Sequence, residues 1–283
     1  MYFIDMKRIV AVITLIACLA LACSCQPMGG NEDDIKDGYL LFGEYPQTVK
    51  AVDVTITDTV DHRGYYLGSD GAYYAKREVT PFGNSAVFSN KEVGFEGDVF
   101  YFKVEPIRWR VVSEYKDSLT LLCDSILYGS VFNSSGRNNY AESDVRKSLN
   151  EDFYNVAFSD GERADIMLSG VDNSPVTTAK RPNYHCCGDT EDYLYLLSYA
   201  DALNTNYGLD NIDNRKIKAT DYAKATGSSN YWWLRSPDSS WDDNAWYVTT
   251  SGSLRCDGWT TDNVDRSVTG TQGVVPAMKI KYE

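Results

Sequence analysis

The side chains best suited to recognition chemistry gather near the C-terminus, where five of the six tryptophans lie at or after Trp232. Large aromatic rings bury much area at small entropic cost, while short polar side chains orient a partner. The alternation of both kinds predicts a surface that binds a protein or a glycan. Its predicted ligand-binding residues are Asp238, Ser239, Ser240, Trp241, Asp242, Asp243, Asn244, Trp246, Arg255, Asp257 and Trp259.

The tryptophans divide into two groups at Pro237. Trp232 and Trp233 belong to an apolar run that ends at a Ser-Pro turn, which is typical of core residues. Trp241 is flanked by Ser240 and Asp242, so we expect its ring to face solvent. For Trp246, a core position and an exposed position are equally compatible with its neighbours.

Metal chemistry is a weaker interpretation of the same residues. Asp238, Asp242, Asp243 and Asn244 offer the oxygen ligands that calcium prefers, but their spacing does not match a helix-loop-helix calcium loop. A solvated acidic loop explains them better. The run His185-Cys186-Cys187 has no second cluster that would complete a zinc site. We therefore predict neither a metal nor a cofactor.

Catalysis finds little support in the residue types. The chain has only two histidines, and no serine lies in a G-x-S-x-G elbow. The cysteines outside the first 25 residues are Cys123, Cys186, Cys187 and Cys256; one bridge among them is possible, although they do not form a disulfide framework. Glycosidases use a pair of carboxylates, and the chain has many, so a glycosidase remains an alternative. We favour a binding protein over an enzyme.

Arg235 follows the tryptophan pair and could be taken for a ligand-binding residue. A guanidinium beneath a loop more often pairs with a partly buried carboxylate or with strand carbonyls. We therefore expect a structural role for Arg235.

Residues 1–25 have the pattern of a lipoprotein signal peptide. Lys7 and Arg8 precede an apolar run that is too short to cross a bilayer core of about 30 Å. Cys23 follows small residues at the end of this run and is the predicted lipidation site, with Cys25 and Cys18 as alternatives; an ordinary cleaved signal is the other possibility. Residues 26–36 suit a flexible tether. These features predict export and a lipid anchor at the bacterial envelope, with display at the cell surface.

The formal net charge is -13, and it becomes -14 without the first 25 residues, which carry Asp5, Lys7 and Arg8. Binding to nucleic acid depends on a basic surface that releases counterions from phosphates. Since no basic run occurs in the chain, we expect no nucleic-acid partner. The only membrane contact expected is the lipid anchor.

The elements that must hold the aromatic segment are mainly strands, with a few short helices. We expect a short strand in residues 37–48 broken at Gly43 and Pro46, hairpins in 52–101, and paired strands at 104–112 and 118–123, with Ile107, Trp109 and Val111 on one face. Helices are expected to begin at Ser143, Ser159, Ser198 and Thr220, the third after an apolar strand at 193–197. Further strands are expected at 245–249 and 273–282. This order predicts an α+β fold in one domain, residues 37–283.

Several ordered motifs resemble a bacterial family of exported domains of unassigned function with a C-type-lectin-like fold. The residues that carry the resemblance are Trp232-Trp233-Leu234-Arg235-Ser236-Pro237, Phe42-Gly43-Glu44-Tyr45-Pro46-Gln47, Pro106-Ile107-Arg108-Trp109-Arg110-Val111, Leu196-Leu197-Ser198-Tyr199-Ala200 and Gly273-Val274-Val275-Pro276-Ala277-Met278. Together these motifs span about residues 37–283. The chain departs from the family at Val275, where arginine is frequent, which puts any role for that position in doubt.

The resemblance implies a C-type-lectin-like fold with mixed antiparallel sheets, a few short helices and long C-terminal loops. The family is similar to the branch of lectin-type folds that is shared by formylglycine-generating enzymes and by the variable proteins of diversity-generating retroelements. One such variable protein is a treponeme variable surface lipoprotein. Variable proteins carry their changing positions near the C-terminus, which corresponds to residues 238–259 here. The competing interpretation is an oxidase of the formylglycine-generating type acting through Cys186, Cys187 or Cys256.

Overall fold

The computed structural model describes residues 34–257 and 267–282. The predicted signal peptide, the candidate lipidation cysteines, most of the tether and Trp259 lie outside these ranges. Within the two ranges, no helix is long and apolar enough to cross a membrane.

A nine-stranded sheet forms one part of the molecule, and its central strand is β7 (Val99–Tyr115). β7 pairs antiparallel with β1 (Tyr39–Val49), β4 (Tyr73–Glu78) and β8 (Ser118–Cys123). The other strands of this sheet are β2 (Ile56–Val60), β3 (Tyr66–Gly68), β11 (Ile166–Met167), β14 (Leu194–Tyr195) and β20 (Ala277–Lys281). The expected hairpins in 52–101 and the expected strand at 118–123 are therefore present.

A second, five-stranded sheet holds the tryptophan pair. Its strand order is β10 (Tyr128–Val131), β19 (Thr271–Val274), β16 (Trp232–Pro237), β17 (Ala245–Val248) and β18 (Leu254–Arg255). Trp232 pairs with Gly273 in parallel, while β16 and β17 are antiparallel. Three small ribbons complete the strands: β5 (Ala86–Val87) with β6 (Val93–Gly94), β9 (Ser125–Ile126) with β15 (Lys218–Ala219), and β12 (Ser169–Val171) with β13 (Thr190–Asp192).

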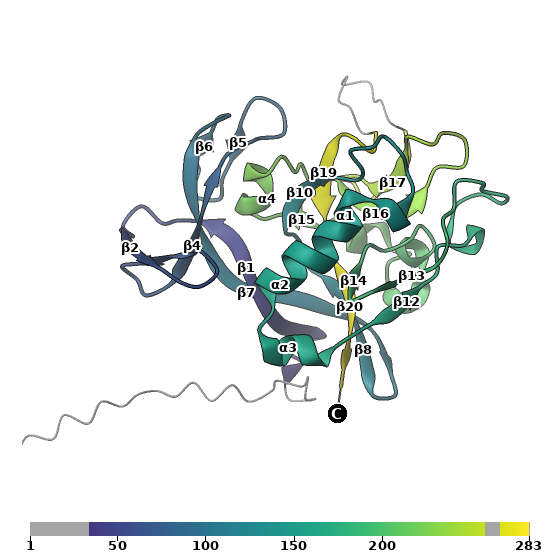
Figure 1. Ribbon diagram of the computed structural model, residues 1–283, viewed down its shortest axis with the longest axis horizontal. Coiled ribbons are helices and arrows are strands. Elements are labelled where there is room, and N and C mark those ends of the chain that lie inside the picture. Colours follow the sequence, from purple (N-terminus) through teal and green to yellow (C-terminus); the bar gives the residue numbers. More distant parts are fainter. Residues whose placement is uncertain (1–33, 258–266, 283) are drawn as a thin grey trace, which may run out of the picture.

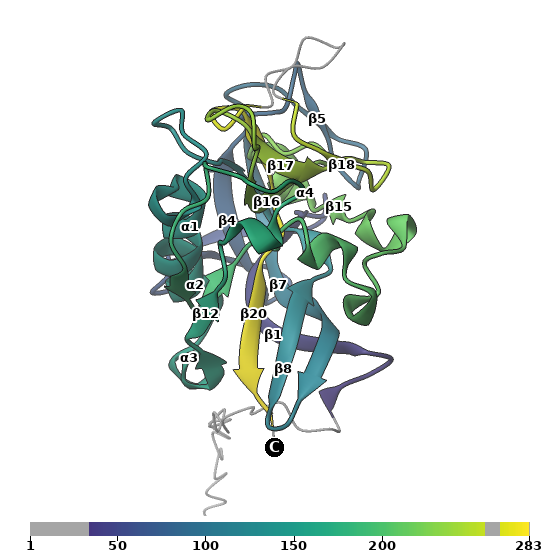
Figure 2. The same ribbon diagram turned by 90° about the vertical axis from the view of Figure 1, so that its right-hand side faces the viewer.

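The helices are short, and Figures 1 and 2 show α1, α2 and α3 along one side of the strands, apart from α4. They are α1 (Asp144–Ser148), the π-helical segment η3 (Leu149–Phe153), α2 (Tyr154–Ala157), α3 (Asp160–Asp165) and α4 (Asp221–Ala225). The 3-10 turns are η2 (Tyr140–Glu142), η4 (Pro175–Thr177), η5 (Asp201–Leu203), η6 (Thr205–Tyr207) and η7 (Ile212–Arg215). Together with the sheets they make an α+β fold, as predicted.

Three of the four predicted helix starts are confirmed, because their capping side chains are in place. Ser143 accepts from the Arg146 N–H, Thr220 accepts from the Ala223 N–H, and Ser159 forms a reciprocal capping box with Glu162. The predicted helix at Ser198 is wrong. Ser198 makes the same reciprocal bonds with Asp201 that Ser159 makes with Glu162, but only the 3-10 turn η5 follows it.

Three predicted strands differ from those observed. β1 is continuous through Gly43 and Pro46, because bulges at both places absorb the irregularity. Gly43 has φ +70°, and a Cβ there would lie 2.6 Å from the Phe158 ring. The closing strand is split into β19 and β20 at Val275 and Pro276, and the apolar strand at 193–197 is reduced to β14.

Two cores hold these elements together. The larger one contains Trp109, Trp232 and Trp233, each fully buried, so the predicted core position of the tryptophan pair is confirmed. Ile107 and Trp109 are both buried, as expected for one face of the strand. The third predicted residue of that face, Val111, is only partly buried, because a bulge after it turns Val112 inward instead. The smaller core is formed around Phe88 and Phe102 under β4 and β7, in the lobe at the left of Figure 1.

Candidate functional site

Three loops meet beside the C-terminal end of β16, and we call their surface the three-loop face: residues 137–141, 183–187 and 238–244. The first and third loops are joined through Asn138. Asn183 donates its side-chain amide to the Pro237 carbonyl at 3.1 Å, which joins the second loop to the third. The backbone N–H groups of Tyr140 and Ala141 face the Cys187 sulfur and join the second loop to the first.

Asn138 is the buried anchor of this surface, with 3% of its area exposed. Its side-chain amide donates to the carbonyls of Trp241 at 2.8 Å and Asn244 at 2.9 Å, and its backbone N–H donates to the Asp242 carbonyl at 2.7 Å. The Val268 N–H adds a bond to the Asp243 carbonyl. The loop between β16 and β17 is therefore held at four consecutive carbonyls.

Trp241 projects from this fixed loop with 64% of its area exposed, so the predicted solvent-facing position is confirmed. Beside it, the Asp242 carboxylate pairs with Arg137 at 3.3 Å, and both side chains are mostly exposed. Asp243 is exposed as well. A ring, a carboxylate and a guanidinium thus stand next to one another on loops that cannot easily rearrange.

Tyr184 adds a second exposed ring to the three-loop face, with 87% of its area exposed. It follows the buried Asn183, whose carboxamide oxygen also accepts from the His185 N–H at 3.0 Å. Tyr184 and Arg137 were not among the predicted ligand-binding residues. The run Asn183 to Cys187 drew attention in the sequence only as a possible metal site.

The remaining predicted residues lie on β17, on β18 or beside them. Trp246 is half-buried, and its ring meets Tyr199 edge to face with centroids 4.4 Å apart. Asp257 accepts a hydrogen bond from the Tyr247 hydroxyl at 3.1 Å, while Arg255 is exposed. Trp246 and Tyr199 therefore supply a third aromatic position near the sheet edge.

The predicted residues differ in accessibility. Asp238 is buried, with its carboxylate accepting from the Ser240 N–H and the Cys256 thiol, so it supports the loop from beneath. The exposed residues are Ser240, Trp241, Asp242, Asp243, Arg255 and Asp257, and the half-buried ones are Ser239, Asn244 and Trp246. Trp259 lies outside the described residues.

Arg235 has the predicted structural role. It is 6% exposed, and its guanidinium donates to the Leu196 carbonyl at 2.7 Å, the Asp201 carboxylate at 2.9 Å and the Asp172 carbonyl at 3.2 Å. These bonds tie β16 to the segment before η5. Arg235 therefore fixes the strand that carries the loop.

The cysteines of residues 34–257 are all free thiols. Burial raises the pKa of Cys186 and Cys187, and burial together with the Asp238 carboxylate raises the pKa of Cys256 to about 12. A raised pKa keeps a thiol protonated at neutral pH, which is unfavourable for a nucleophile. In the described part of the chain, no three His, Cys, Asp or Glu side chains are grouped closely enough to hold a metal ion.

Replacing Asn138 by Ala is expected to loosen the three-loop face. The part-buried Trp241 carbonyl loses its donor and the Asn244 carbonyl keeps only the Asp238 N–H, which should lower the free energy of unfolding by about 1–2 kcal/mol. Amide hydrogen exchange at Asp238 and Val268, which donate to this loop, should become faster. The exposed Asn206→Ala serves as a control, and unchanged exchange in Asn138→Ala would show that the loop does not depend on this anchor.

The comparisons with known proteins identify a family but no function. Residues 116–282 match the family described as "Domain of unknown function (DUF6273)". No curated protein and no solved structure was found to be similar to the chain. The match covers β8 to β20, more than half of the chain, and includes the whole three-loop face. The protein therefore belongs to the DUF6273 family.

Proposed function

We propose that this protein is a ligand-binding lipoprotein, exported and lipid-anchored at the bacterial envelope, whose three-loop face recognises a protein or a glycan. The proposal includes the finer fold assignment, a C-type-lectin-like domain similar to variable proteins of diversity-generating retroelements. The buried Trp-Trp-Leu-Arg-Ser-Pro strand followed by an exposed loop is consistent with that assignment.

The exposure of Trp241 carries the proposal. An indole ring that is 64% exposed leaves apolar area in water, and four held carbonyls keep the loop from folding it inward. A rigid aromatic anchor loses little entropy when it binds, which favours recognition. Tyr184 on the second loop adds another exposed ring, and the Arg137–Asp242 pair adds charged groups that can orient a partner.

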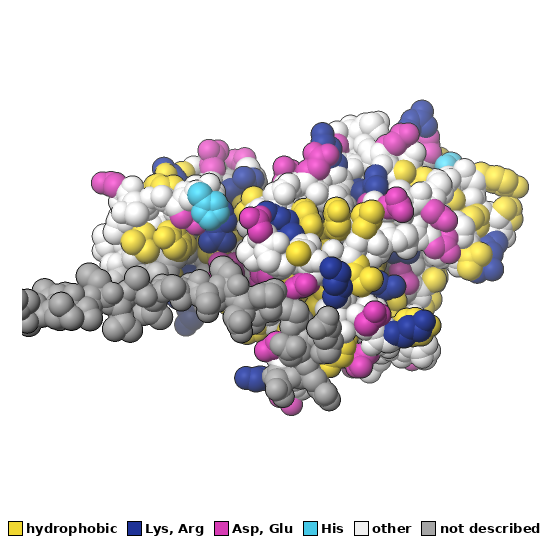
Figure 3. Space-filling view, turned by 60° about the horizontal axis from the view of Figure 1, so that its bottom comes forward, with side chains coloured by type: hydrophobic (Ala, Val, Ile, Leu, Met, Phe, Trp, Pro, Cys, Tyr) yellow, Lys and Arg dark blue, Asp and Glu magenta, His cyan; other side chains and the backbone are white. Residues whose placement is uncertain are grey.

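The arrangement of the chain ends supports display of this surface. Figures 1 and 2 show β17 at one end of the molecule, whereas β1 begins near the C-terminus at the other. A tether before Asp34 would therefore leave from the end opposite the loop between β16 and β17. On the face that is turned forward in Figure 3, acidic and basic side chains are interspersed with apolar ones.

Substitution of Trp241 by Ala should weaken binding strongly while the fold persists. We expect the full-length protein to bind at least one ligand on arrays of glycans and of extracellular proteins. Trp241→Ala should weaken that binding by about 30-fold, which corresponds to roughly 2 kcal/mol at a binding hot spot. Its melting temperature should stay close to that of the wild type, because the removed ring is exposed.

Tyr115→Ala provides the matched control. Tyr115 is 67% exposed and lies in the turn between β7 and β8, away from the three-loop face. The Tyr115→Ala variant should bind the ligand as the wild type does. Equal binding by the Trp241 and Tyr115 variants, or no binding to either array by the wild type, would count against the proposal.

A further inference from the structure

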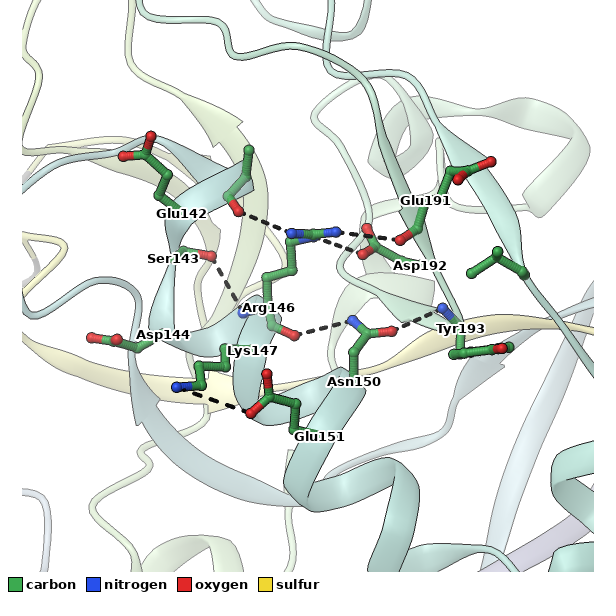
Figure 4. Close-up of a pocket in the computed structure, with 12 residues that line it drawn as sticks. Glu142, Ser143, Asp144, Arg146, Lys147, Asn150, Glu151, Glu191, Asp192 and Tyr193 are labelled. Carbon is green, nitrogen blue, oxygen red and sulfur yellow. Dashed lines mark hydrogen bonds and ion pairs between the residues drawn. The ribbon is translucent and has the colours of Figure 1, made fainter.

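A groove beside the three-loop face, with which it shares Ala141, lies between α1 and the β12–β13 ribbon. Its volume is about 450 Å³, within the range of roughly 300–1,000 Å³ that is usual for ligand pockets. Figure 4 shows the side chains that line it, which come from η2, α1, η3 and β13. None of its lining residues belongs to the predicted ligand-binding set.

The floor of the groove is a rigid ion pair. Arg146 donates to the Asp192 carboxylate at 2.6 Å, and that carboxylate is fully buried and also accepts from Thr190. The same guanidinium donates to the carbonyls of Ala141 at 2.9 Å and Glu191 at 3.3 Å. These bonds use three of its five N–H donors, so two remain for a ligand.

The rim of the groove is acidic, and two of its carboxylates flank the floor arginine. Glu142 and Glu191 both line the groove, and Figure 4 draws their side chains on opposite sides of the Arg146 guanidinium. Both are exposed. Five carboxylates and only two basic side chains line the groove as a whole.

The walls contribute apolar contact. Leu168 lines the groove and is 52% exposed. Tyr193 lines it too, and its ring is held by stacking on Tyr154, with centroids 4.7 Å apart. Asn150 holds this wall against the helix, because it accepts from the Tyr193 and Leu194 N–H groups and donates to the Arg146 carbonyl. The groove is therefore preformed.

We infer that this groove binds a basic peptide segment in extended form. Side-chain ammonium or guanidinium groups of the peptide pair with Glu142 and Glu191, and peptide carbonyls accept from the two remaining N–H groups of Arg146. The methylene stems of the basic side chains contact Leu168 and Tyr193. A polyanion is disfavoured, because the carboxylates on both sides of Arg146 repel it.

The test is titration calorimetry of the full-length protein with trilysine at low salt. Trilysine should bind, triglutamate should not, and added salt should weaken the binding. The double variant Glu142→Gln/Glu191→Gln should bind trilysine at least about fivefold more weakly. Both glutamate side chains are exposed, so this variant should fold normally.

A control pair removes the same charge elsewhere. Glu96→Gln/Glu114→Gln changes two exposed glutamates outside the groove and should bind trilysine as the wild type does. Equal weakening in both double variants would mean unspecific attraction to an acidic protein and would overturn the inference, as would absent trilysine binding or binding of triglutamate. Trp241→Ala should leave trilysine binding unchanged, so this result is independent of the proposed function.

Discussion

Replacing Trp233 by Ala should lower the free energy of unfolding by about 3–5 kcal/mol, which is the usual cost of removing a large buried ring. Trp233 is fully buried in β16, and its ring meets Phe132 edge-on with centroids 5.6 Å apart. Its indole N–H also donates to the Ser130 carbonyl at 2.9 Å, which ties β16 to β10 across the intervening β19. Chemical denaturation measures the change.

Such a loss is a large share of the roughly 5–15 kcal/mol that stabilises a typical domain. Trp233→Phe tests the reason for it, because Phe keeps part of the ring contact but cannot donate to Ser130. We expect an intermediate loss for Phe and almost none for the exposed Trp241→Ala. If Trp233→Ala were no less stable than Trp241→Ala, the tryptophan pair could not be the anchor of the five-stranded sheet.

Replacing Arg235 by Ala should cost about 3 kcal/mol of stability, although no ligand contact is removed. The substitution leaves the Leu196 and Asp172 carbonyls without their side-chain donor, and it removes the cation from the Asp201 carboxylate, which keeps only its bonds from Ser198. Ligand binding should fall only as far as the folded fraction falls. A thermal melt and a binding titration on the same sample separate the two effects.

The partner variant Asp201→Asn sharpens this test. If the ion pair carries the effect, the loss in the double variant should be smaller than the sum of the two single losses, by about 1 kcal/mol or more. Strict additivity would assign the role of Arg235 to its two carbonyl contacts alone. An unchanged melting temperature together with lost binding would instead make Arg235 a ligand-binding residue.

Those parts of the fold that depend on local signals could be predicted from the sequence. Ser143, Ser159 and Thr220 cap helices because a short side-chain oxygen meets the free N–H groups of the first turn nearby. Ser198 carries the same signal and makes the same bonds with Asp201, yet only the 3-10 turn η5 follows; there Asp201 also binds Arg235, which is distant in sequence. A long-range contact of this kind leaves no trace in a local pattern.

The candidate site also contains residues that local sequence could identify and residues that it could not. Trp241 could be identified as exposed because its polar neighbours are adjacent in the chain. Asn138, Arg137 and Tyr184 could not, since they reach the face only through bonds to residues more than 50 positions away. The buried position of Asp238 was also hidden, because its contact with Cys256, which follows β18, joins residues far apart in the sequence.

The central position of β7 has a consequence for how far the domain extends. The family match begins at residue 116, immediately after β7, yet β8 is buried along its whole length and takes its ladder partners from β7 on one side and β20 on the other. The stretch of sequence that is inherited as a recognisable unit is therefore smaller than the stretch that must fold together. Excision of the chain at the family boundary would bare an apolar strand edge, which is a known route to aggregation.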